Sequence, residues 1–140
     1  MSPEQNRALV RRWYDDVLND RNFAAVDEIV APDFVINGQP VGSEGIRQAA
    51  VWVRSVFPDL RVTVEDVVAE RDRVVTRFTA RATHCGEFLG VPATGKAVTM
   101  SGVHVDRVAH GRIAERWETV DLLGLLQQLG ATIQPPRPPG

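Results

Sequence analysis

The first 57 residues repeat apolar side chains at three- and four-residue intervals, which is typical of helices that bury one face. Ser2 and Gln5 flank Pro3 in the pattern of a capping box, which marks the start of the first helix. The third helix is expected to stop before Pro58, because proline disfavours helical backbone in the residue that precedes it. The expected elements are helices over about 2–19, 23–30 and 43–57, with a short strand over 34–36.

From Leu60 onward the apolar residues alternate with polar ones, which predicts strands. The clearest run is "VVTRFTARATH", residues 74–84, whose even-numbered positions form the less polar face. Strands are expected over about 60–65, 74–84, 97–108 and 112–121, followed by a short helix in "LLGLLQQLG". Helices followed by a meander predict an α+β fold, a cone-shaped curved antiparallel sheet with about three N-terminal helices over its concave face. We expect one domain over 1–130 and a proline-rich flexible tail over 131–140.

The stretch "RWETVD", residues 116–121, decides which side chains of the last strand should face the interior. Arg116 and Glu118 are charged, so the strand pattern predicts that they point outward and that Trp117, Thr119 and Asp121 point inward. Trp117 is then expected on the same interior face as His84. Aligning the hairpins about their turns places His84, Val98 and Asp121 in one line across three strands. On this alignment the interior face is apolar except for four residues, namely His84, His104, Glu115 and Asp121.

Each polar exception also has a purely structural interpretation. Asp121 precedes a helix, where aspartate is a favoured N-cap. A histidine on an apolar face is often a hydrogen-bonded core residue, which applies to His104 and His84. Glu115 is expected to pair with Arg107 or Arg112 at the surface if the strand twists. The three tryptophans are also typical core residues, so the function rests on several such groups converging on one cavity.

The chain has 140 residues with a net charge of −2, and its acidic and basic residues are interspersed. This distribution argues against a nucleic-acid partner, which favours a basic face. The single cysteine, Cys85, excludes an internal disulfide and favours a reducing compartment. The N-terminus lacks the apolar core of a signal peptide, and no apolar run approaches the length of a membrane span. We therefore expect a cytoplasmic protein with no membrane partner.

The positions of the histidine, acidic and cysteine residues do not favour a metal site or a catalytic thiol. The three histidines and the acids near them lack the spacing of a metal site, so no metal is expected. Cys85 lies on the outward side of its strand, which makes it a poor nucleophile candidate.

The segments "THCGEFLGVPATGK" (83–96), "SGVHV" (101–105) and "GRIAERWETVD" (111–121) resemble the SnoaL-like polyketide cyclase family, as does "FPDLRV" at 57–62. The resemblance covers about residues 3–130. It implies the cone-shaped α+β fold shared with nuclear transport factor two and ketosteroid isomerase. It also implies a cofactor-free ring closure by intramolecular aldol condensation, with Asp121 at the position of the general acid/base. Many relatives carry a histidine where this chain has Asn37, whose amide binds a carbonyl oxygen but moves no proton near neutral pH.

The expected site combines this resemblance with the interior positions of the strands and of the first helix. A carboxylate walled by apolar side chains is expected to have a raised pKa, which suits a base that removes a proton flanked by carbonyls. The expected catalytic residues are Asp121, His104 and His84, and the expected substrate-binding residues are Trp13, Tyr14, Asn37, Trp52, Phe78, Met100 and Trp117.

Two other functions fit the same residues. An epoxide-opening or pyran-forming cyclase or hydrolase needs two proton carriers close together, for which His104 with Glu115 or Asp121 are candidates. A non-catalytic binding or accessory protein for an oxidative enzyme needs no perturbed carboxylate. All three take a small molecule as partner. We also expect a homodimer through the outer sheet face, because Val103 and Val105 point outward on a central strand and relatives of this family commonly dimerise there.

Overall fold

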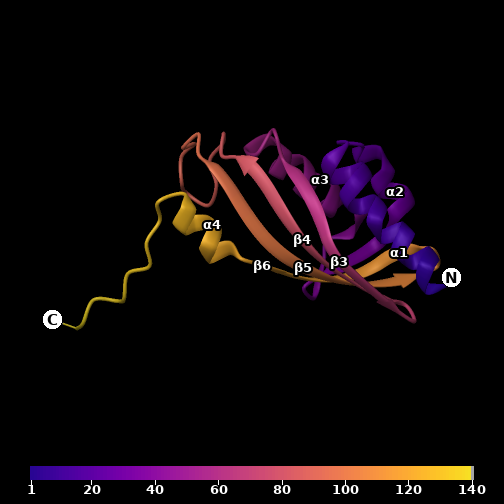
Figure 1. The fold of residues 1–140 in the computed structure, drawn as a ribbon. Coiled ribbons are helices and arrows are strands. Elements are labelled where there is room, and N and C mark those ends of the chain that lie inside the picture. The colour runs from indigo at the N-terminus through magenta and orange to yellow at the C-terminus, as the bar shows by residue number, and fades with distance from the viewer. Residues whose placement is uncertain (140) are drawn as a thin grey trace.

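The computed structural model describes residues 1–139 and forms one curved sheet with helices packed over its concave side (Figure 1). The elements follow in the order α1 (Pro3–Arg12), η1 (Trp13–Asn19), η2 (Phe23–Ala25), α2 (Val26–Ile29), β1 (Val30–Ile36), β2 (Gln39–Pro40), α3 (Gly42–Val56), β3 (Arg61–Glu70), β4 (Arg73–Thr83), β5 (Ala97–Ala109), β6 (Arg112–Val120) and α4 (Leu122–Gln128). The α+β class and the predicted order of elements are therefore confirmed.

The six strands lie in the order β2-β1-β6-β5-β4-β3. The meander from β3 to β6 is antiparallel as predicted, but β1 pairs with β6 in parallel, so the sheet is mixed. β1 is also longer than expected and begins at Val30, which shortens the predicted second helix to α2. β1 and β6 lie far apart in the sequence, and sequence spacing alone carries no information on their pairing.

The first helix begins as the sequence predicts. Ser2 Oγ accepts a hydrogen bond from the Gln5 backbone N–H at 3.1 Å, and Gln5 Oε1 accepts one from the Ser2 backbone N–H at 2.8 Å. The helix then widens to π-helical turns in η1, a form that is rare and often found at functional sites. Trp13 and Tyr14, at the start of η1, are 3% and 0% exposed and both face the sheet.

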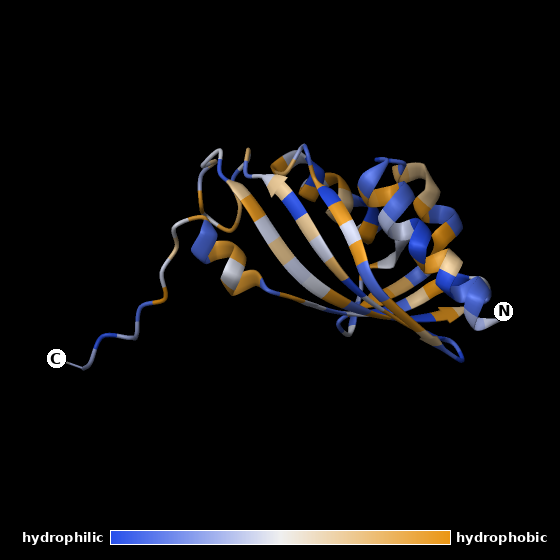
Figure 2. Ribbon diagram, in the orientation of Figure 1, coloured by the Kyte–Doolittle hydropathy of each residue, from blue (hydrophilic) through white to orange (hydrophobic). Residues whose placement is uncertain are grey.

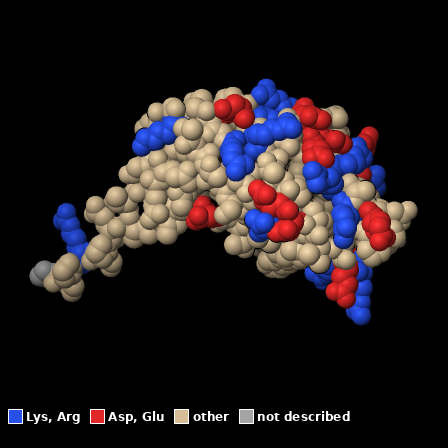
Figure 3. Space-filling model, viewed as in Figure 1, with Lys and Arg blue, Asp and Glu red and all other residues tan. Residues whose placement is uncertain are grey.

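The core lies between the concave face of the sheet and the helices (Figure 2). The even-numbered face of β4 is buried as predicted, from Val74 at 0% to Phe78 at 5% exposure. Figure 3 shows acidic and basic side chains interspersed over the helical end, without a large basic patch among the described residues on this face. No helix within residues 1–139 is both long and apolar enough to cross a membrane.

The predicted facing of β6 is wrong, because a β-bulge changes its alternation. Val108 pairs with Ile113, but Arg107 pairs with Glu115, so Ala114 is an extra residue on β6. With regular alternation from buried Ile113, residues 115, 117 and 119 would face the interior. Beyond the bulge, Arg116 and Glu118 face the interior instead.

As a result, Arg116 faces the interior at 1% exposure, whereas Trp117 is 49% exposed on the convex face, opposite to buried His84. The predicted line of His84, Val98 and Asp121 is not formed either. Val98 pairs with Ala82, and the Asp121 backbone N–H donates to Ser101 at 2.9 Å.

The structural interpretation of Asp121 is confirmed. Its Oδ1 accepts a hydrogen bond from the Gly124 backbone N–H at 2.9 Å and caps α4. The carboxylate is exposed to solvent. Glu115 pairs with Arg107 at 3.5 Å, also as its structural interpretation predicts.

Residues 131–139 form no helix or strand and leave the domain beyond α4 (Figure 1). Deleting residues 134–140 is therefore expected to change the melting temperature by no more than about one or two degrees. A deletion that starts at Leu122 is the matched comparison, because it also removes Leu125 and Leu129, which are 3% and 4% exposed. Differential scanning calorimetry of both variants tests this, and a large drop for the shorter deletion would show that the tail docks.

Candidate active site

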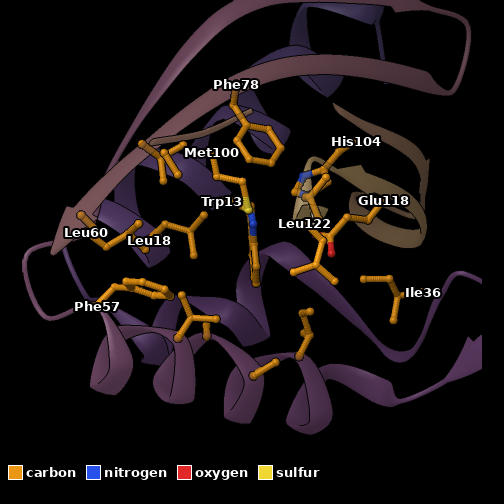
Figure 4. Close-up of a pocket in the computed structure, with 18 of the residues that line it drawn as sticks. Trp13, Leu18, Ile36, Phe57, Leu60, Phe78, Met100, His104, Glu118 and Leu122 are labelled. Carbon is orange, nitrogen blue, oxygen red and sulfur yellow. Dashed lines mark hydrogen bonds and ion pairs between the residues drawn. The ribbon is translucent and has the colours of Figure 1, made fainter. Parts of the chain in front are cut away.

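A cavity of about 370 Å³ lies between α3 and the concave face of β3–β6, and Leu122 and Leu125 of α4 also line it (Figure 4). Almost all of its lining side chains are apolar. Its charged or titratable lining residues are His104, Arg116 and Glu118. Figure 4 shows His104 and Glu118 at one end, Phe57 and Leu60 at the other, and Trp13 between them. The site thus has one polar end and one apolar end.

His104 links Glu118 to a buried tyrosine. Its Nε2 lies 2.6 Å from Glu118 Oε2, and its Nδ1 lies 2.7 Å from the Tyr14 hydroxyl. The ring of Phe78 packs against the imidazole, with 4.7 Å between ring centroids. β5 and β6 bring His104 and Glu118 directly opposite each other, which fixes the contact between the two side chains.

The pKa shifts at these groups determine where the protons lie. Burial, followed by the nearby Arg116 charge, lowers the pKa of His104, so its imidazole is neutral at neutral pH. The hydrogen bond from His104 lowers the pKa of Glu118 and outweighs the effect of burial, so Glu118 is a carboxylate. A carboxylate only accepts hydrogen bonds, so His104 carries its proton on Nε2 and Nδ1 accepts from Tyr14. Burial raises the pKa of Tyr14, which keeps that hydroxyl protonated.

Arg116 forms a buried ion pair beneath Glu118. Its Nε and Nη2 donate to the two carboxylate oxygens of Asp106 at 2.7 and 3.0 Å. Burial opposes the charge of Arg116, but the attraction and hydrogen bonds of Asp106 prevail and raise its pKa. The guanidinium also lies over the Trp13 ring, 4.7 Å from the centroid. The interior of this end of the sheet therefore holds a permanent cation.

Asn37 positions Glu118 from the outside. The Asn37 Oδ1 accepts a hydrogen bond from the Glu118 backbone N–H at 2.8 Å, and Asn37 itself is exposed and does not line the cavity. Its backbone has a φ of +50°, a conformation that asparagine adopts more readily than most residues. Asn37 therefore contacts the backbone of a residue that lines the cavity and does not itself form part of the cavity wall.

The structure brings together four of the predicted site residues around the cavity, namely Trp13, Phe78, Met100 and His104. Tyr14 lies behind His104 rather than on the cavity wall.

The other predicted residues lie elsewhere. Trp52 is 46% exposed on α3 and stacks on Phe88, with 5.8 Å between ring centroids, and Trp117 is on the convex face. His84 is fully buried, with Nδ1 bonded to Thr94 at 2.9 Å and Nε2 without a partner in residues 1–139. Neither His84 nor Asp121 is among the cavity-lining residues.

Acidification is expected to destabilise this protein through His104 and Glu118. Both have folded-state pKa values below the reference values of 6.5 and 4.5, so the folded state binds fewer protons than the unfolded one. Their contribution is complete above the unfolded pKa and is lost as the pH falls through the folded pKa. Urea denaturation should show that the free energy of unfolding falls between about pH 7 and about pH 4. In E118Q this fall should be smaller, because the variant lacks the Glu118 carboxylate. A free energy that rises on acidification from pH 7 would contradict this.

The site offers no arrangement for a metal ion. Within residues 1–139, no group of three or more His, Cys, Asp or Glu side chains is placed to hold one. What the arrangement offers instead is a carboxylate with a neutral imidazole and a buried guanidinium, in an apolar enclosure. These groups suit proton transfer and the binding of a developing negative charge.

Comparisons with known proteins agree with the fold. The SnoaL-like polyketide cyclase family profile matches residues 8–129. The nogalonic acid methyl ester cyclase of Streptomyces nogalater is 29% identical over 111 residues, which cover 75% of this chain and 83% of the relative. TsrD from Streptomyces laurentii superposes with a TM-score of 0.87 at 29% identity, over 94% of this chain and 99% of TsrD. IdmH from Streptomyces antibioticus superposes with a TM-score of 0.81 at 34% identity, over 91% and 99% of the two chains. The chain therefore belongs to the SnoaL-like polyketide cyclase family.

Proposed function

We propose that this protein is a cofactor-independent cyclase that closes a ring in a polyketide-like small molecule by an intramolecular aldol-type reaction. The observation that carries the proposal is the Glu118 carboxylate, which lies on the wall of an apolar cavity and is held there by neutral His104. A cavity of about 370 Å³ is within the range of small-molecule sites.

The reaction needs one group that removes a proton and later returns one. Glu118 takes a proton from a carbon that is flanked by carbonyl groups, which leaves an enolate. The carbanion carbon then attacks a second carbonyl of the same molecule, so that one carbon–carbon bond forms and that carbonyl oxygen becomes an alkoxide. Glu118 returns its proton to the alkoxide, and the product has the same atoms as the substrate.

The surroundings of Glu118 fit both halves of this cycle. Its lowered pKa keeps it ionised at neutral pH, so it is free to accept a proton. A lowered pKa also makes it a weaker base than the raised pKa expected from the sequence, so the carbon that it deprotonates has to be activated by the carbonyl groups on both sides. Tyr14 holds the His104 ring in the orientation that presents Nε2–H to Glu118, so the base has one fixed position. The apolar walls hold the flexible substrate folded, and this proximity supplies a large part of the rate. The proposal thus gives Glu118 the role that the family resemblance implied for Asp121.

The test is turnover without any added cofactor, after treatment with a chelator. The substrates are nogalonic acid methyl ester and aklanonic acid methyl ester, on which the named cyclase relatives act. Mass spectrometry should show a product of unchanged mass and a new chromatographic mobility. If the esters stay unchanged but an aryl epoxide such as styrene oxide gains one water, the result would favour an epoxide hydrolase instead. A protein that binds these esters without changing them would favour an accessory role.

We propose further that two copies of the chain associate through the convex face of the sheet. Val68, Val75, Val105 and Trp117 pair directly across β3, β4, β5 and β6 and form one apolar row. Val68 and Trp117 at its ends are 63% and 49% exposed. An exposed apolar row of this kind on a sheet face favours burial against a second copy.

Light scattering at micromolar concentration is expected to give about twice the chain mass of 15.5 kDa. The Trp117→Arg variant places a charge in the apolar row and should give the mass of the single chain. Trp52→Arg is the matched control, because Trp52 is equally exposed but lies on α3, and it should leave the mass unchanged. A wild-type mass of 15.5 kDa would contradict the dimer.

A further inference from the structure

Two hydrogen-bond donors on residues of the cavity wall have no partner within residues 1–139. Arg116 uses Nε and Nη2 to hold Asp106, but its Nη1 makes no hydrogen bond within residues 1–139. The indole N–H of Trp13 makes none either. Both residues are almost fully buried, but these two nitrogen atoms are not completely enclosed by protein. Because both residues line the cavity, these two donors open onto it.

The two donors belong to side chains that are in contact. The Arg116 guanidinium lies over the Trp13 ring, 4.7 Å from the centroid, so the groups stay in contact. Arg116 and Glu118 point to the same side of β6, two residues apart, which separates their Cα atoms by about 7 Å. Arg116 and Glu118 therefore both line the polar end of the cavity, where one ligand can contact both side chains.

We infer that Arg116 and Trp13 form an oxyanion-binding site that takes an enolate or phenolate oxygen of a planar ligand. A free polar donor in an otherwise apolar wall is costly unless a ligand satisfies it. A guanidinium and an indole N–H are both donor-only groups, so they bind an acceptor oxygen and favour an anionic one. The ion pair with Asp106 holds the guanidinium rigidly, as preorganised stabilisation of a developing charge requires.

The charges around the site support this assignment. Glu118 and Arg116 on β6 and His104 on β5 face the ligand. Asp106 on β5 lies behind Arg116, and Tyr14 on η1 lies behind His104. Proton transfer from the substrate to Glu118 neutralises that carboxylate and places one negative charge on the substrate oxygen. The net charge of the site stays constant, and the oxygen that becomes anionic is the one that the Arg116 and Trp13 donors would bind. This role rests on the proposed function for its meaning in catalysis, but the binding is measurable without turnover.

The experiment titrates bound 2-hydroxyanthraquinone, whose visible absorption changes when its hydroxyl ionises. All variants carry E118Q, which represents the site with a neutral base and removes the competing carboxylate. W13F deletes the indole N–H while keeping an aromatic ring over the guanidinium. W52F is the matched control, because Trp52 lies outside the cavity. The double substitution D106L/R116M removes the guanidinium together with its partner, which avoids leaving a buried charge unpaired.

In E118Q and E118Q/W52F the bound ligand should ionise at the same pH. In E118Q/W13F the midpoint should rise by about one to two pH units, the shift expected on losing one hydrogen bond to a charged group. In the E118Q variant that also carries D106L/R116M, the midpoint should rise at least as much. A midpoint that moves no more in W13F than in W52F would overturn the site, as would a ligand that binds none of the variants. Loss of the Glu118 role in turnover would leave these shifts in place, so the two proposals fail separately.

Discussion

Glu118→Gln is expected to lower kcat by about 10²-fold or more, the contribution typical of a positioned general base. The amide has nearly the shape of the carboxylate, and its oxygen still accepts the hydrogen bond from His104 Nε2. It does not accept a proton at working pH. The loss should therefore appear in turnover while the folded structure stays intact, which circular dichroism and calorimetry verify.

Asp121→Asn is the matched control for this variant. It also converts a carboxylate to an amide near the end of β6, but Asp121 caps α4 and does not line the cavity. Because asparagine and aspartate cap helices about equally well, D121N should keep turnover within about threefold of the parent. If D121N is inactive and E118Q active, the general base is Asp121 and the assignment of Glu118 is wrong.

Arg116→Met is expected to cost about 3–5 kcal/mol of folding free energy, the typical effect of breaking a buried ion pair. Asp106 is 0% exposed. Within residues 1–139, Arg116 is the residue whose side chain donates hydrogen bonds to the Asp106 carboxylate, so removing it leaves a buried charge without a donor. Urea denaturation at neutral pH measures the change, and a loss below about 1 kcal/mol would contradict a buried, dependent pair.

The double variant D106L/R116M separates the ion pair from simple packing. Replacing both charged partners with apolar residues of similar size is often neutral, so most of the lost stability should return. If the double variant is as unstable as R116M alone, the effect comes from the shape of the Arg116 side chain, which packs against Trp13.

Local patterns predicted the parts of the fold that depend on short-range physics. The capping box at Ser2 and the cap at Asp121 require only a few neighbouring residues, and both were confirmed. The alternating face of β4 was also correct, because β4 pairs with β5 in one continuous register. The interior positions of His104 and Met100 were predicted correctly for the same reason, because both residues continue that face on β5 and line the cavity.

The bulge at Ala114 explains why Glu118 and Arg116 were missed. A charged strand residue normally points to solvent, and nothing local to "RWETVD" indicates that the alternation has changed. One signal was present on the neighbouring strand. Asp106 shares the inward face of β5 with His104, and a buried carboxylate requires a cation on the facing strand. Arg116, directly opposite, is that cation, and its inward position brings Glu118 inward too.

Proton exchange at carbon tests most directly whether Glu118 is the general base. The probe is an aromatic β-keto ester that lacks the further carbonyl group that the carbanion would attack, so the ring cannot close. NMR follows the replacement of its acidic hydrogen by deuterium from D₂O, at a pD where the uncatalysed exchange is slow. The wild type and D121N should accelerate this exchange, and E118Q should leave it at the rate in buffer. Exchange by E118Q as fast as by the wild type would show that another group takes the proton.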